Sequence, residues 1–215
     1  MGKITDSLLS GVNGKVGNLV IYKQKGKTFI KQIAVRSGEY KPSKKQIYSN
    51  MAFVEVQKFL LPIELVLAVG FGRFVSGGKR GIHVAMSWAL KHAVENEDGV
   101  PRLYPEKVKV CGGDLDLAPG LKLVKDGDGS YSISWIVEEV GRARHSDLCW
   151  VLIYHPLHKS YQVIDGGVYR KRGLLQFTPH PNLDLVGGYV YVSFYRSKKN
   201  DSRLFSDSIC LGRLE

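Results

Sequence analysis

The chain has 215 residues, 44% of them hydrophobic, and its 31 Lys and Arg residues exceed its 20 Asp and Glu residues to give a net charge of +11. This apolar fraction excludes a disordered or fibrous protein and allows one large domain or two small ones. A membrane span is also excluded, because the most apolar run, 59–71, contains Pro62 and Glu64 and is shorter than the roughly 20 residues of a spanning helix.

The first 48 residues contain ten Lys and Arg residues and only Asp6 and Glu39 as acidic ones. Two strands are predicted here, at 16–22 and 28–35, joined by a polar turn that contains Gly26. Neither strand alternates cleanly, so we expect both faces of this hairpin to be covered, by the rest of the chain or by a neighbour. The local excess of positive charge is suited to a polyanion or to an acidic partner surface.

Helices are predicted next, from apolar residues that recur at helical spacing. The first follows Pro42, with Ser43 as its N-cap, and runs to about residue 61, where Pro62 interrupts it. Its packed face is expected to combine Ile47, Met51, Phe53, Val54, Val56 and Leu60. Two further helices are expected at 63–71 and 82–94.

From residue 104 onward, short alternating runs separated by turns predict about seven or eight strands. They are expected at 107–111, 121–125, 130–137, 148–154, 161–168, 173–178, 189–195 and 206–211. This pattern is typical of an immunoglobulin-like or fibronectin-like antiparallel β-sandwich. The predicted fold class is therefore α+β, with a basic β-hairpin and helical region at 1–98 and a sandwich at 105–215.

Several short strings in the chain form a pattern that extends over nearly its whole length. They include MGKI at the start, GKVGN at 14–18, AMSWALKHAV at 85–94 and GGDL at 112–115. In these strings the chain resembles an uncharacterised family of Bacteroidota proteins catalogued as a domain of unknown function. The resemblance implies a basic N-terminal region with helices, followed by an all-β half. It implies no established activity and no functional residues.

Motifs for a phosphate, a metal or a nucleophile are weak. The glycines at 11–17 lead into a strand rather than a helix, whereas 77–81 precedes a helix and is either a site for a single phosphate or a flexible joint. The sequence at 126–129 fits a hairpin turn better than a calcium loop. His155 and His158 have no third ligand nearby, and Cys149 near His145 and Asp147 fits a buried structural thiol.

We therefore expect a protein that is not an enzyme and has no cofactor, no metal and no small-molecule substrate. The three cysteines and the lack of a clear secretory signal predict a cytoplasmic protein with reduced thiols.

Two functions fit these observations. The first is a structural or adaptor protein that docks on itself or on another protein through the hairpin and the sandwich. The alternative is sequence-independent binding of DNA or RNA, with lysines on phosphates and aromatic rings stacked on bases. The residues predicted to bind are Lys15, Lys23, Lys25, Lys27, Lys31, Lys44, Lys45, Lys79 and Arg80, with Tyr22, Phe29 and Tyr40 as stacking residues.

Overall fold

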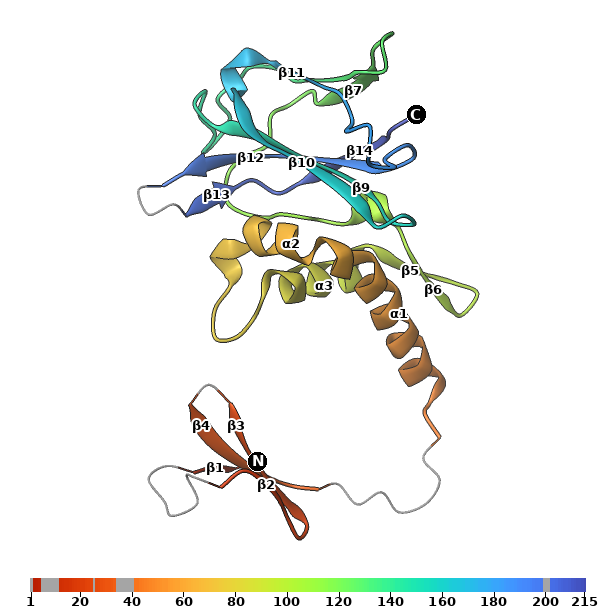
Figure 1. Ribbon diagram of the computed structural model, residues 1–215, viewed down its shortest axis with the longest axis vertical. Coiled ribbons are helices and arrows are strands. Elements are labelled where there is room, and N and C mark those ends of the chain that lie inside the picture. Colours follow the sequence, from red (N-terminus) through yellow and green to blue (C-terminus); the bar gives the residue numbers. More distant parts are fainter. Residues whose placement is uncertain (1, 5–11, 25, 34–40, 199–201) are drawn as a thin grey trace. The chain divides into compact units, whose positions relative to one another are not determined.

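The computed structural model describes residues 2–4, 12–24, 26–33, 41–198 and 202–215 (Figure 1). It divides into two compact units, Met1–Ser43 and Lys44–Glu215. Together they form an α+β protein in which all pairings between named strands are antiparallel.

The first unit contains a four-stranded sheet. Its strands are β1 (Gly2–Ile4), β2 (Gly14–Val16), β3 (Leu19–Gln24) and β4 (Lys27–Gln32), in the order β1-β4-β3-β2. The predicted hairpin is confirmed as the β3–β4 pair, with Gln24 opposite Lys27 at its closed end. Gly17 and Gly26 have φ values of 60° and 71°, and such positive values suit glycine in the two tight connections. The structure adds β1 and β2 on the two sides of the hairpin.

The second unit begins with three helices, α1 (Lys44–Leu60), α2 (Glu64–Gly70) and α3 (Gly81–His92). These confirm the predicted helices within about two residues at each end. A short 3-10 helix, η2 (Leu61–Ile63), follows α1 at Pro62, because proline cannot donate the backbone hydrogen bond that would continue the helix. A second, η3 (Gly72–Phe74), follows α2.

The strands of the second unit form three sheets. A hairpin consists of β5 (Val94–Glu97) and β6 (Val100–Leu103), and a three-stranded sheet has the order β11-β8-β7. A five-stranded sheet has the order β10-β9-β12-β13, with β14 also paired to β12. The bounds are β7 (Lys122–Lys125), β8 (Tyr131–Ser134), β9 (Leu148–His155), β10 (Ser160–Tyr169), β11 (Leu174–Phe177), β12 (Tyr189–Ser197), β13 (Arg203–Phe205) and β14 (Ile209–Arg213). Two further 3-10 turns are η4 (Pro105–Lys107) and η5 (Arg170–Arg172).

The two central strands of the five-stranded sheet, β9 and β12, are buried on both faces. Successive residues of β9 alternate between two cores, since side chains of a strand point to opposite faces in turn. Trp150, Leu152 and Tyr154 belong to a core shared with the three helices. Cys149, Val151 and Ile153 belong to a second core shared with β8 and β11. The helices, the five-stranded sheet and the three-stranded sheet are therefore successive layers of this unit (Figure 1).

This layering differs from the expected arrangement in one respect. The predicted end of the first domain, at residue 98, falls inside the β5–β6 hairpin, and the helices before this hairpin share a core with the strands after it. The strand order does not establish an immunoglobulin-like topology, which stays a prediction.

The strand predicted at 107–111 is wrong. Residues 105–107 form η4, and the next residues are extended without pairing to a named strand. Their backbone is held by a side chain instead, because the N–H groups of Val110 and Cys111 donate to Ser208 Oγ at 2.9 Å and 3.3 Å. A buried backbone donor needs a partner, and this serine hydroxyl takes the place that a neighbouring strand would occupy.

The packed face of α1 was also predicted incorrectly in part. Ala52, Val56, Phe59 and Leu60 are buried, but Ile47, Met51, Phe53 and Val54 are 45%, 41%, 46% and 44% exposed. The helix is thus apolar on two sides, and only one side packs against the core. Its N-terminal half extends away from the five-stranded and three-stranded sheets (Figure 1).

Candidate binding surfaces

The N-terminal sheet carries a basic and aromatic face. Tyr22 lies opposite Phe29, and Val20 lies opposite both Lys31 and Lys15, so these side chains share one side of the sheet. Lys27 has the same orientation, because it lies two residues before Phe29 on β4. We call Lys15, Tyr22, Lys27, Phe29 and Lys31 the basic–aromatic face.

The two rings of this face contact each other. Their centroids are 5.7 Å apart with planes at 23°, and Lys31 Nζ lies 5.7 Å from the centre of the Tyr22 ring. The three lysines are exposed, while both rings are half-buried. The rings therefore form a small apolar centre with positive charge around it.

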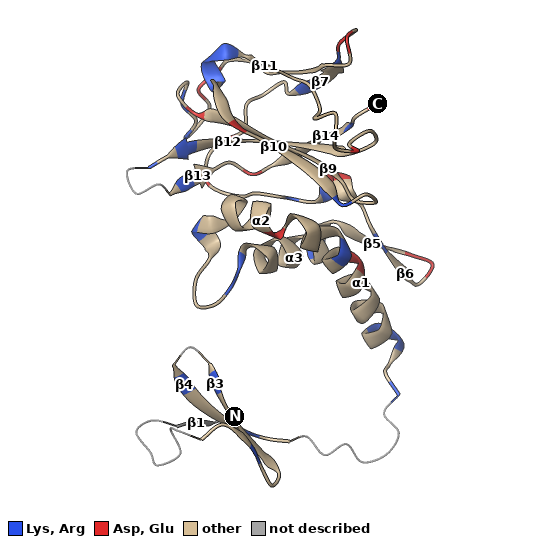
Figure 2. Cartoon of the chain, in the orientation of Figure 1, with Lys and Arg blue, Asp and Glu red and all other residues tan. Residues whose placement is uncertain are grey.

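The other predicted residues lie elsewhere. Lys23 is on the opposite side of β3, in line with Ile21, and Lys25 and Tyr40 lie outside the described residues. Lys44 and Lys45 form the start of α1 in the second unit. Lys79 and Arg80 come directly before α3, where Arg80 forms an ion pair with Glu64 at 2.7 Å. Figure 2 shows these basic positions at the start of α1 and in the loop before α3.

A second surface runs along the outer side of α1. Ile47, Met51 and Val54 are spaced four and three residues apart, so they lie on one stripe of the helix. The buried residues Val56 and Leu60 lie on the other side. We call Ile47, Met51 and Val54 the α1 stripe. Lys58, one turn further along, is exposed and pairs with Glu55 at 3.2 Å.

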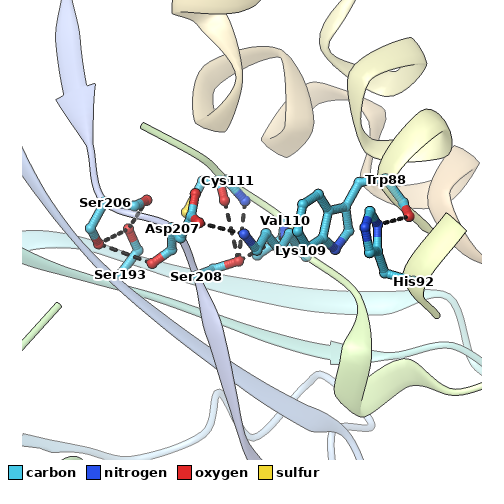
Figure 3. A network of polar contacts seen from close by, with 9 residues as sticks. All are labelled: Trp88, His92, Lys109, Val110, Cys111, Ser193, Ser206, Asp207 and Ser208. Carbon is cyan, nitrogen blue, oxygen red and sulfur yellow. Dashed lines mark hydrogen bonds and ion pairs between the residues drawn. The ribbon is translucent and has the colours of Figure 1, made fainter. Parts of the chain in front are cut away.

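A third surface is a cleft of about 700 Å³ beside α3. Among its lining residues, the Trp88 indole lies between two groups (Figure 3). The His92 ring stacks on it with centroids 3.9 Å apart, and Lys109 Nζ lies 3.6 Å from its ring centre. Lys109 also forms an ion pair with Asp207. His92 Nδ1 donates to the Trp88 carbonyl oxygen at 3.0 Å.

One hydrogen-bond donor in this wall is unused. Trp88 Nε1 is buried and has no acceptor among the described residues. Buried polar groups are nearly always hydrogen-bonded, so an orphan donor is unusual. We call this hollow, including Lys79 and Lys91 at its border, the α3 cleft. Sequence reasoning missed it, although Trp88 and His92 are four residues apart on one helix face.

A polar network lies next to the cleft and fixes the segment that carries Lys109. Ser193 Oγ and Ser206 Oγ are 3.0 Å apart, and the Phe194 N–H donates to Ser206 Oγ at 3.0 Å. Ser208 Oγ accepts from the segment 110–111, as described above. Burial raises the pKa of the Cys111 thiol beside these groups to about 12, so the thiol stays protonated at neutral pH.

Cys149 and Asp147, two of the three residues considered for a nucleophilic site, are both buried. Asp147 is fully buried and its carboxylate accepts from Arg196 Nε at 2.7 Å and from the Arg144 N–H at 2.8 Å. Burial raises the pKa of the Cys149 thiol to about 12. This agrees with the interpretation of Cys149 as a structural thiol.

Searches for relatives add no assignment. No family model matches the chain, and no curated protein matches it, so the resemblance to the Bacteroidota family stays a prediction. In the described part of the chain, no group of three or more His, Cys, Asp or Glu residues is arranged to hold a metal ion. None of the helices there has the length and apolar character needed to cross a membrane.

Proposed function

We propose that this chain is a non-catalytic structural protein that assembles with further copies of itself. The observation that carries the proposal is the α1 stripe, because α1 is apolar on two sides and uses only one of them in its own core. Large apolar side chains gathered on one exposed surface are typical of interaction sites.

The spacing of the stripe favours a second copy as the partner. Intervals of four and three residues are those of the seam along which two helices pack. A stripe of this kind is complementary to itself, so a two-fold axis across α1 brings the same residues together from both copies. Lys58 and Glu55 beside the stripe balance each other as an ion pair, and Lys44 lies at its N-terminal end.

The N-terminal sheet supports the same proposal. In the order β1-β4-β3-β2, each outer strand has one edge without a partner among the described residues, and such an edge can accept a strand from another chain. A unit of 43 residues is also close to the lower limit, about 40 residues, at which a chain forms a stable core alone. In this proposal the sheets that share the second core act as a sandwich-like scaffold.

Light scattering at several protein concentrations tests the proposal. We expect the average mass to rise with concentration for the wild-type chain and to stay at the monomer value for Val54→Lys. The matched control is Val186→Lys, since Val186 is 70% exposed and lies in another part of the unit. A wild-type monomer at all concentrations, or equal effects of the two substitutions, would count against self-assembly through α1.

The basic–aromatic face favours a second candidate, sequence-independent binding of nucleic acid. Lys15, Lys27 and Lys31 surround the half-buried Tyr22–Phe29 pair, and lysines beside aromatic rings are typical of surfaces that hold single-stranded nucleic acid. Lysine is a point charge without a bidentate fork, so this binding would be weakly specific.

A gel-shift titration separates this candidate from the first. Single-stranded DNA should bind more weakly as salt increases, with a slope of roughly 0.7 per phosphate contacted. The double variant Lys27→Glu and Lys31→Glu should reduce binding strongly, while Lys122→Glu with Lys159→Glu should change it little. The absence of a shift at low salt would exclude nucleic-acid binding and leave the self-assembly proposal untouched.

A further inference from the structure

The α3 cleft has a pronounced imbalance of charge. Lys79, Lys91 and Lys109 border it, and Asp207 is the only acidic residue among its lining residues. Asp207 is already paired with Lys109. No acidic side chain of the described residues forms an ion pair with Lys79 or Lys91, and both lysines are exposed. Two positive charges therefore face the cleft without compensation.

The walls of the cleft are apolar and aromatic. Phe71 and Phe74 line it with their rings 6.4 Å apart and tilted by 56°, and Val84 and Trp88 contribute from α3. Its volume of about 700 Å³ lies in the range of roughly 300–1,000 Å³ that is usual for small-molecule sites. Apolar walls with a few polar groups are the composition of such sites.

Both positive groups come from positions that the fold fixes well. Lys91 lies in the last turn of α3, one residue before His92, which is stacked on Trp88. Lys79 lies two residues before Gly81, and a side chain at Gly81 would come within 2.1 Å of the Leu67 carbonyl oxygen. This close approach of α3 to α2 fixes the position at which the loop with Lys79 enters the helix.

We propose that the α3 cleft binds a small organic anion that has a flat aromatic part. Lys91, in the last turn of α3, holds its phosphate, sulfonate or carboxylate group, and the aromatic part lies against Phe71, Phe74 and the rim of Trp88. Lys79, at the other end of α3, adds to the positive potential of the cleft. A charged ligand group gains charge-assisted hydrogen bonds from a lysine ammonium group. The apolar walls remove the flat part of the ligand from water. This site is independent of the α1 stripe and of the N-terminal sheet.

Direct binding of two matched probes tests the proposal on the full-length protein. The anionic probe is 8-anilinonaphthalene-1-sulfonate, and the neutral one is N-phenyl-1-naphthylamine, which has the same aromatic system without the sulfonate. Isothermal titration calorimetry measures the affinity and the number of sites for each probe. We expect the anionic probe to bind at one saturable site. The affinity of the neutral probe should be lower by a factor of about ten or more.

Variants identify the groups involved. The double variant Lys79→Gln and Lys91→Gln should lower the affinity for the anionic probe about tenfold. The control variant Lys122→Gln with Lys159→Gln should leave this affinity unchanged. Phe74→Ala should weaken both probes, because it removes the apolar wall. Adenosine monophosphate should compete with the anionic probe, and inorganic phosphate alone should compete much less well.

Several results would overturn the proposal. Equal affinity for the two probes, or no effect of the lysine pair, would show an apolar patch without anion recognition. Equal competition by phosphate and by adenosine monophosphate would remove the role of the aromatic part. Binding of several probe molecules per chain without saturation would show that no defined site exists.

Discussion

The helical layer is expected to contribute to stability through one side of α1 only, and two phenylalanines on this helix test the expectation. Phe59 is 6% exposed, Phe53 is 46% exposed, and both have the same chemistry. The Phe59 ring meets the Tyr154 ring edge to face, with centroids 5.1 Å apart and planes at 76°. The Tyr154 hydroxyl also donates to the Phe59 carbonyl oxygen at 2.8 Å. Phe59 thus joins α1 to the centre of the five-stranded sheet.

Substitution by alanine at the two positions should have very different costs. Truncation of a buried phenylalanine costs about 3–5 kcal/mol, from the lost transfer energy and the cavity that remains. We expect the free energy of unfolding to fall by about 3–4 kcal/mol for Phe59→Ala. For Phe53→Ala, whose ring is already half in water, we expect a loss of about 1 kcal/mol or less.

Urea denaturation followed by tryptophan fluorescence measures both values. The dependence of the unfolding free energy on urea concentration should have a similar slope in the two variants. The variants should therefore differ in the urea concentration at the midpoint of unfolding. Similar losses for the two variants would refute the assignment of the packed side of α1. A loss below about 1 kcal/mol for Phe59→Ala would show that the helices do not share a core with the sheet.

Two further predictions concern close packing and pH. Gly81→Ala should destabilise the protein by more than about 1 kcal/mol in the same urea assay, because the added methyl group would meet the Leu67 carbonyl; Gly72→Ala, where no atom lies within 4 Å, should change stability little. Burial raises the pKa of the thiols of Cys111 and Cys149 from 9.0 to about 12. Their neutral forms are therefore favoured by folding, so this stability is complete below pH 9 and is lost as pH rises from 9 towards 12. Denaturation midpoints should fall between pH 8 and about pH 10.5, and the fall should be smaller in Cys149→Ala; a midpoint independent of pH in this window would contradict the burial of these thiols.

Local patterns predicted most of the elements. The three helices follow from apolar periodicity and from the position of Pro62, and the β3–β4 hairpin follows from the turn at Gly26. The orientation of α1 could not be predicted in the same way, because Ile47 and Val54 are as apolar as Val56. Which side is covered depends on α3 and β6, and on Tyr154 of β9, all of which come later in the chain. The error at 107–111 has a related cause, since the partner of that segment is Ser208.

The candidate surfaces were predictable only in part. The lysine excess of the N-terminal segment is visible in the sequence, but the gathering of Lys15, Lys27 and Lys31 on one side depends on strand register. Lys23 was predicted to belong to the same binding surface, but strand alternation places it on the opposite side of the sheet. The sequence does not indicate Lys109 as a site residue, because its contact with Trp88 joins an extended segment to a helix and is not visible in a local pattern.

Strands β9 and β12 lie between the two hydrophobic cores, and this position determines how the second unit unfolds. Each contributes every second side chain to one core and the remaining ones to the other. Because β9 and β12 contribute side chains to both hydrophobic clusters, displacement of these strands disrupts both clusters at once. The two clusters are therefore thermodynamically coupled. Loss of the helices should therefore loosen β8 and β11, which the helices do not cover. Amide exchange in β9 and β12 should occur only through global opening of Lys44–Glu215, which makes these two strands the slowest-exchanging segment of the unit.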